Sequence, residues 1–166
     1  MKIAVFSDSH DQLDYLKRAL LSATENGCAQ LIHCGDLVAP FILSALAEGF
    51  AGPVHIVFGN NDGDRSSLTR RTLKVFPQVI IEGEMAELDI DGKKIFVTHY
   101  PRYGQLAAAT GQYDLVCYGH DHKKNLIAMG KSLLLNPGNL CGIGGQPSWA
   151  VYDTVSGSAK IIDLKI

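Results

Sequence analysis

The sequence predicts an α/β protein of the mixed α+β type, arranged as a four-layer sandwich of two mixed β-sheets flanked by helices. The first part of the chain alternates short apolar runs with helical patterns, which is typical of parallel strands covered by helices. The second part contains two hairpin signals, Asp91-Gly92 and Ser156-Gly157. About ten strands are expected in all, and because a single sheet of that width is uncommon, two packed sheets are the better interpretation.

Each predicted element follows from its local pattern. In the first part, strands are expected at 2–7, 31–34 and 54–58, and helices at about 11–25, 40–48 and 64–74. Gly27 suits the end of the first helix, and Pro40 suits the start of the second. In the second part, strand pairs are expected in "AELDIDGKKIFVTH" and "WAVYDTVSGSAKIIDLKI", with an Ala-rich helix near 104–110 and the strands "LVCYG" and "SLLLN" between them.

The length and charge of the chain limit its class. The 166 residues fit one domain, 1–166, which is long enough to bury a sizeable core. A formal net charge of -2 creates no overall positive field, so nucleic acid and anionic membranes are not expected as partners. No apolar stretch approaches the about 18 residues of a membrane span, and the chain starts without a signal-peptide pattern. A soluble, cytoplasmic protein is therefore expected.

Four cysteines, Cys28, Cys34, Cys117 and Cys141, form no C-x-x-C pair. Buried free thiols are the favoured interpretation over disulfides or a thiolate metal site. The cysteines are therefore not expected to take part in the chemistry.

Polar side chains gather where the predicted strands end. Five apolar runs finish in "SDSH", "CGD", "GNND", "THY" and "YGHDH". Because ligands bind beyond the carboxyl ends of strands in parallel α/β sheets, these clusters are expected to meet at one place. Four of the six histidines also follow strand ends: His10, His99, His120 and His122. His33 and His55 lie inside strands and are expected to be packed or hydrogen-bonded, and "FGNND" taken alone is also typical of an ordinary turn.

Side chains of Asp, Asn and His without thiolates form a mixed oxygen and nitrogen ligand set. Such a set suits Mn, Fe, Zn, Ni or Co rather than a cysteine-rich structural zinc site. The clusters offer too many such groups for one tetrahedral ion, but two ions about 3.5–4 Å apart that share one carboxylate would use them all. The sequence therefore predicts two divalent metal ions, with manganese as the first choice.

The ordered series of motifs carries a family resemblance. Asp8-x-His10, Gly35-Asp36, Gly59-Asn60-Asn61-Asp62, His99 and Gly119-His120-x-His122 resemble the calcineurin-like metallophosphoesterase superfamily. The stretches "SDSHD", "HCGD", "GNND" and "NPGN" are similar to those of its small, single-domain YfcE-type phosphodiesterases. The resemblance implies two β-sheets sandwiched between helices. It also implies one metal on Asp8, His10 and His122, a second on Asn60, His99 and His120, and Asp36 as the bridge between them.

The formal charges at this site indicate that it suits phosphodiesters. Two divalent ions, the carboxylates of Asp8 and Asp36 and a bridging hydroxide leave one positive charge, which attracts a diester monoanion. Metal binding would lower the pKa of water toward roughly 7, so hydroxide is available at neutral pH and would attack phosphorus in line. The predicted function is a dinuclear metal-dependent phosphodiesterase that hydrolyses a small-molecule phosphodiester.

Asn61 departs from the pattern of many relatives, in which a histidine in G-N-H-[DE] stabilises the transition state or protonates the leaving group. An amide donates a hydrogen bond but delivers no proton, and general acid catalysis is worth typically 10²- to 10⁴-fold. Asn61 is therefore predicted as a catalytic and substrate-binding residue, and the enzyme is expected to work best on phosphodiesters whose leaving group is already acidic or whose own chemistry supplies the proton. Asp62 is predicted to orient Asn61 or a water, or else to cap the helix that starts near Asp64.

Two further departures bear on the substrate. Tyr100 follows His99 where the family often has Gly, so its ring is predicted to contact substrate, with ordinary packing as the alternative. Asp121 stands where relatives usually carry Thr, which adds a negative charge near the metals unless the side chain points away.

Two alternatives to a phosphodiesterase stay open. One is a phosphomonoesterase or nucleotide pyrophosphatase, against which Asn61 argues weakly. The other is a non-catalytic scaffold like the retromer subunit that resembles the same family, against which the complete set of predicted ligands argues. Assembly into a homo-oligomer is left open.

Overall fold

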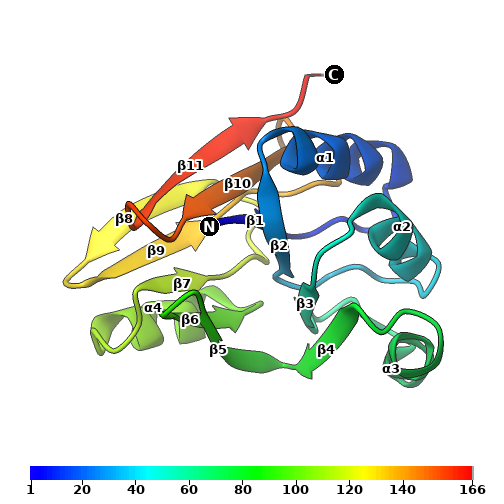
Figure 1. Cartoon of the computed structure of the whole chain (residues 1–166), viewed down its shortest axis with the longest axis horizontal. Coiled ribbons are helices and arrows are strands. Elements are labelled where there is room, and N and C mark those ends of the chain that lie inside the picture. Colours follow the sequence, from blue (N-terminus) through cyan, green and yellow to red (C-terminus); the bar gives the residue numbers. More distant parts are fainter. Residues whose placement is uncertain (166) are drawn as a thin grey trace.

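The computed structural model describes residues 1–165, in which two β-sheets lie between helices (Figure 1). The 6-stranded sheet has the order β11-β10-β1-β2-β3-β4, and the 5-stranded sheet has the order β5-β6-β7-β9-β8. The first sheet consists of β1 (Lys2–Phe6), β2 (Cys28–His33), β3 (Val54–Val57), β4 (Val79–Gly83), β10 (Ser148–Asp153) and β11 (Ser158–Asp163). The second consists of β5 (Met85–Ile90), β6 (Lys93–Thr98), β7 (Leu115–Cys117), β8 (Asn125–Met129) and β9 (Ser132–Asn136). The helices are α1 (Leu13–Glu25), α2 (Ile42–Gly49), α3 (Arg65–Lys74) and α4 (Pro101–Ala109).

Three apolar clusters fill the three spaces between the four layers. Successive side chains of a strand point to opposite faces, so Ala4 and Phe6 of β1 pack with α1 and α2, whereas Ile3 and Val5 pack between the two sheets. A third, smaller cluster around Ala108 joins α4 to the second sheet. Strands that are buried on both faces read as continuous apolar runs, which is the pattern of the first part of the sequence. The predicted four-layer architecture is confirmed.

Several elements differ from the prediction. The sequence pattern does not predict the strands β4 and β8. Both are edge strands, and their half-exposed residues give a weak apolar pattern. The last helix begins at Pro101 rather than near 104, because proline occupies its first turn. Pro40 does not start α2: the amide of Ile42 donates to the carbonyl of Ala39, so a tight turn precedes the helix.

Both predicted hairpins are present. In the first, Ile90 pairs with Lys93, and Asp91 and Gly92 have positive φ angles of 54° and 73°, as a two-residue turn requires. The second hairpin joins β10 to β11, and its last predicted residue, 166, lies outside the described part of the chain.

Strand direction brings the polar loops to one edge. The strands β1, β2 and β3 run parallel, and so do β6, β7 and β9 in the other sheet. The loops that follow β1, β2, β3, β6 and β7 contain the five predicted polar clusters. Within residues 1–165, no helix has the length and apolar character needed to cross a membrane.

Candidate metal centre

Backbone hydrogen bonds join the loops that carry the predicted ligands. The amides of Asp8 and His10 donate to the carbonyls of Gly35 and Asp36, at 3.0 Å each, so the loops after β1 and β2 lie side by side. In the other sheet, the loops after β6 and β7 are joined at Gly119 and His99. The amide of His120 donates to Oδ2 of Asp8 at 3.1 Å and thereby connects the loops of the two sheets.

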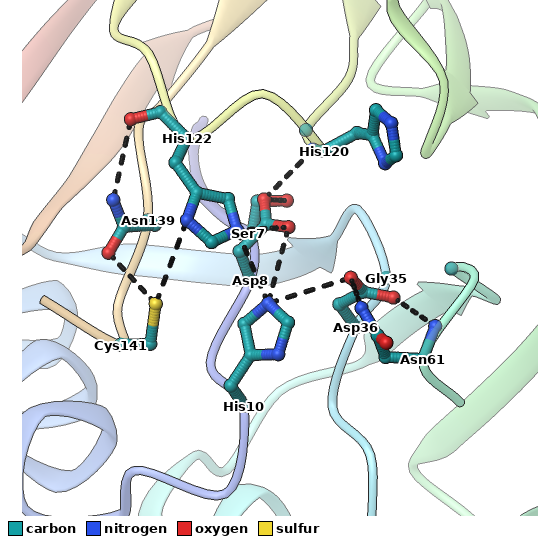
Figure 2. A network of polar contacts seen from close by, with 12 residues as sticks. Ser7, Asp8, His10, Gly35, Asp36, Asn61, His120, His122, Asn139 and Cys141 are labelled. Atoms are coloured by element: carbon teal, nitrogen blue, oxygen red, sulfur yellow. Dashed lines mark hydrogen bonds and ion pairs between the residues drawn. The ribbon is translucent and has the colours of Figure 1, made fainter. Parts of the chain in front are cut away.

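The first group of side chains consists of Asp8, His10 and His122 (Figure 2). Nε2 of His10 and Nε2 of His122 lie 3.3 Å apart. They are 3.8 Å and 3.4 Å from Oδ1 of Asp8, respectively. Three potential ligand atoms therefore converge on one point.

The second group consists of Asn60, His99 and His120. Oδ1 of Asn60 is 3.0 Å from Nε2 of His99 and 2.8 Å from Nδ1 of His120. The two histidine nitrogens are themselves 3.3 Å apart. This arrangement again places one oxygen and two imidazole nitrogens around a common point.

Asp36 lies between the two groups. Its Oδ2 atom is 3.5 Å from Nε2 of His10 and 3.4 Å from Nε2 of His99. The grouping matches the two ligand sets and the bridging carboxylate that the family resemblance implies.

The residues fit divalent cations on chemical grounds. Oδ1 of Asp8 is buried and has no hydrogen-bond partner among residues 1–165, while Oδ2 accepts from Ser7 and from the amide of His120. A buried carboxylate oxygen without a partner is costly, and a cation next to it removes that cost. Imidazole, carboxylate and amide oxygen together suit first-row divalent metals.

The carboxylates and imidazoles of the centre shift one another's pKa values. Burial raises the pKa of Asp36, but hydrogen bonds from His99 and Asn61 outweigh burial and hold this pKa well below its ordinary value. The contact with Asp8 raises the pKa of His10 against the opposing effect of burial. Burial lowers the pKa of His99, yet Asp36 and Asp8 raise it more, so the net shift is upward. Cations at this place are therefore favoured, whether protons or metal ions.

The backbone at the centre is strained. Five of the seven predicted ligands have φ angles in the left-handed region: Asp8, His10, Asp36, His120 and His122. Such residues cost of order 1–3 kcal/mol each and persist only where the surrounding structure holds them. The loop hydrogen bonds described above supply that restraint, so the ligand geometry is imposed by the fold.

Gly59 lets the loop after β3 lie close to Asp36. A Cβ atom at Gly59 would lie 2.1 Å from Oδ1 of Asp36 and 2.6 Å from its backbone nitrogen. Gly119 is similar, because a Cβ there would lie 2.6 Å from Oδ2 of Asp8. These two glycines let neighbouring loops reach the carboxylates.

Asp62 does not cap α3, which corrects one of the two expectations for this residue. Its side chain is only 3% exposed and accepts hydrogen bonds from the backbone amides of Asp36, Val38 and Gly59 at 2.7–3.0 Å. Asp64 caps α3 instead, accepting from the amide of Ser67. Asp62 therefore connects the loop after β2 to the loop after β3, and its part in catalysis stays a prediction.

Tyr100 borders the second group. Its ring centroid is 5.3 Å from that of His99 and 5.6 Å from that of His120. It also lines a surface hollow of about 590 Å³ together with Tyr103, Leu106 and neighbouring charged side chains. Asp121, by contrast, points away from the ligands, since its Oδ1 accepts from Asn136 and from the amide of Lys123.

Sequence reasoning missed Arg65, which braces the loop after β3. Its guanidinium donates to the carbonyls of Gly59 and Asp62 at 2.9 Å and 3.2 Å and lies 4.9 Å from the ring centroid of Phe58. The positive charges on this helix do not predict the contact from the sequence, because the contact depends on how α3 packs against the loop.

The cysteines are free, as predicted, and one of them, Cys141, lies beside the first ligand group. Its Sγ atom is 3.9 Å from Nδ1 of His122 and 3.2 Å from Oδ1 of Asn139 (Figure 2). Burial raises the pKa of this thiol. The "NPGN" stretch, which belongs to the motif series, ends in Asn139, and Cys141 follows two residues later. His33 and His55 are hydrogen-bonded, as predicted, to Ser9 and Glu82.

Comparison with known proteins agrees with the motifs. A family model for the calcineurin-like phosphoesterase superfamily domain matches residues 1–157. Phosphodiesterase MJ0936 of Methanocaldococcus jannaschii is 33% identical over 157 residues, which cover 93% of this chain and 93% of that protein. Phosphodiesterase YfcE of Escherichia coli K12 is 27% identical over 159 residues, or 89% of this chain and 84% of that protein. A solved structure of an archaeal phosphodiesterase has a TM-score of 0.91 at 32% identity, covering 99% of this chain and 100% of that one.

Proposed function

Since the chain belongs to the calcineurin-like phosphoesterase superfamily, we propose that it is a phosphodiesterase with a dinuclear metal centre. One observation carries the proposal: two groups of oxygen and nitrogen ligands converge on either side of one carboxylate, Asp36. The similarity to proteins named as phosphodiesterases supports the diester as substrate class.

The chain's own residues would hold two divalent ions. Asp8, His10 and His122 form one ligand set, the second set is Asn60, His99 and His120, and Asp36 is shared. When bound, the ions would activate a water nucleophile and stabilise charge on the phosphate oxygens. Manganese is the first metal to test, followed by nickel, iron, zinc and cobalt.

Asn61 limits the leaving groups that the site can handle. Its side-chain amide is exposed beside Asp36 and can donate a hydrogen bond to a phosphate or leaving-group oxygen. It cannot release a proton at accessible pH. We therefore propose that substrates have a leaving oxygen that departs without protonation, such as a phenolate.

Tyr100 provides a surface for the remainder of the substrate. Its ring lies beside His99 and His120, and Tyr103 stands almost perpendicular to it at a centroid distance of 5.9 Å. An aromatic group next to the scissile phosphate could pack in the adjoining hollow. Small aromatic diesters are therefore the proposed first substrates.

Turnover by metal-reconstituted protein tests the proposal. The chelated protein is loaded with each divalent metal and assayed with bis-p-nitrophenyl phosphate, p-nitrophenyl phosphate and a nucleotide pyrophosphate. We expect metal-dependent hydrolysis of the diester, lost in His99→Gln and retained in His55→Gln, because His55 pairs with Glu82 outside the centre. Faster turnover of the monoester or pyrophosphate would favour those alternative activities, and no turnover with any metal would favour a scaffold. Cytoplasmic location and homo-oligomer formation stay predictions.

A further inference from the structure

The two ring nitrogens of His122 face different partners (Figure 2). Nε2 faces the first ligand group, 3.4 Å from Oδ1 of Asp8 and 3.3 Å from Nε2 of His10. Nδ1 faces the opposite way, toward Sγ of Cys141 at 3.9 Å. If Nε2 is to bind a metal, the proton of the neutral ring must be on Nδ1, where the sulfur is its hydrogen-bond acceptor.

Asn139 directs the Cys141 thiol proton away from His122. The S–H group donates to Oδ1 of Asn139 at 3.2 Å, and the amide of Gly142 donates to the same oxygen at 2.7 Å. The side-chain amide of Asn139 in turn donates to the carbonyls of His122 and Ile143. Asn139 is 2% exposed, so these bonds are formed in a buried place. With its proton engaged by Asn139, the sulfur presents a lone pair to the imidazole.

His99 shows the same arrangement with a different acceptor. Its Nδ1 lies 2.8 Å from the carbonyl oxygen of Cys34, and its Nε2 faces Asp36. Histidines that bind metals typically donate their second ring N–H to a carboxylate or carbonyl, which fixes tautomer and orientation. His122 has the Cys141 sulfur at the equivalent place.

We infer that Asn139 and Cys141 are positioning residues that hold His122 in the Nδ1-protonated tautomer, with Nε2 directed at the first metal. The inference rests on the proposed metal centre, in which His122 is a ligand. It assigns a function to the loop after β9, the third parallel strand of the second sheet. It also gives a reason for the thiol of Cys141 to face a predicted ligand.

Nitrogen NMR of the protein with ¹⁵N-labelled histidine tests the tautomer directly. In metal-free protein, long-range nitrogen–proton correlations should show His122 protonated at Nδ1, and His122→Gln identifies its signals by their absence. Cys141→Ala should convert these signals to an average of the two tautomers, and Cys141→Ser, which keeps an acceptor, should retain more of the Nδ1-protonated form. Cys28→Ala is the matched control, because Cys28 lies on β2 and contacts none of the predicted ligands.

Cobalt titration tests the consequence for the metal. Cys141→Ala should weaken binding at one of the two sites by roughly 10- to 100-fold and leave the other unchanged. Unaltered His122 signals together with unaltered affinity in Cys141→Ala would overturn the inference. A near-ultraviolet thiolate-to-cobalt charge-transfer band that disappears in Cys141→Ala would also overturn it, because Cys141 would then be a ligand itself. Wild-type protein that binds no cobalt would instead count against the proposed function, while the tautomer measured without metal would still decide the inference.

Discussion

Nδ2 of Asn61 donates a 2.8 Å hydrogen bond to Oδ2 of Asp36, and the backbone amide of Asn61 donates to Oδ1 at the same distance. One residue therefore contacts both oxygens of the carboxylate that lies between the two ligand groups. Any substitution at position 61 except proline keeps the backbone hydrogen bond to Asp36. Variants at this position therefore test the chemistry of the side chain while one contact still holds Asp36 in place.

Asn61→His should introduce a proton donor. For diesters with weakly acidic leaving groups, we expect kcat/KM to rise, up to the 10²- to 10⁴-fold that general acid catalysis provides. For p-nitrophenolate, which leaves unprotonated, little change is expected. The measurement is the slope of log kcat/KM against leaving-group pKa, with Asn61→Ala as a control that slows all substrates alike. Parallel slopes for wild type and Asn61→His would exclude Asn61 from leaving-group chemistry.

Gly59→Ala should disrupt the centre by steric contact. The new methyl group would overlap Oδ1 of Asp36 and displace the carboxylate. We expect metal affinity to fall by roughly 10- to 100-fold, the range for the loss of groups that orient ligands. Gly63→Ala is the matched control in the same loop, because a Cβ at Gly63 meets no atom within 4 Å. Equal metal affinity of the two variants would show that the loop shifts without cost.

Asp62→Asn should destabilise the fold. An asparagine keeps one acceptor oxygen, but its NH₂ group would face backbone amides that now donate to Asp62. Leaving such buried donors without an acceptor costs about 1–3 kcal/mol in the free energy of unfolding. Urea unfolding of the metal-free protein measures the change. Asp64→Asn is the control, since asparagine caps a helix as well as aspartate does, and comparable losses in the two variants would contradict the role given to Asp62.

The stability of the metal-free protein should be greatest near pH 6.5. Burial lowers the pKa of His33 to about 4, whereas the unfolded residue takes up a proton near its ordinary pKa of 6.5. Stability should therefore fall between these two pH values as the solution becomes more acidic, by roughly 3 kcal/mol. His10 and His99 have raised pKa values when folded, so the stability from their protonated forms is complete below pH 6.5 and is lost as the pH rises through those values.

Urea unfolding in the presence of EDTA across this pH range measures both effects. In His33→Gln the decline on the acid side should be smaller, because the buried group no longer titrates. A stability that is flat from neutral pH to the pKa of folded His33 would contradict this account of the buried histidine.

The layers of the fold and the meeting of polar side chains at one sheet edge can be predicted from the sequence, because both follow from the local pattern of apolar and polar residues. Apolar runs that end in Asp, Asn or His place these side chains at the carboxyl ends of strands, where chain direction alone brings them together. The same reasoning does not reveal the contacts of Asp62 and Gly59 with Asp36, because these contacts join loops that are distant in sequence. It also overlooked Cys141, because composition treats a lone cysteine as core and cannot show which side chain its sulfur faces.

The bond between the amide of His120 and the Asp8 carboxylate spans 112 positions of the chain and connects the two sheets. Divalent ions held by Asp8, Asp36 and the surrounding histidines would add a removable cross-link at the same place. An ion that binds only the folded chain stabilises it by mass action. Chelation should then lower the unfolding temperature together with the proposed activity, so that one chelator titration followed by calorimetry would report on the fold and on the metal centre at once.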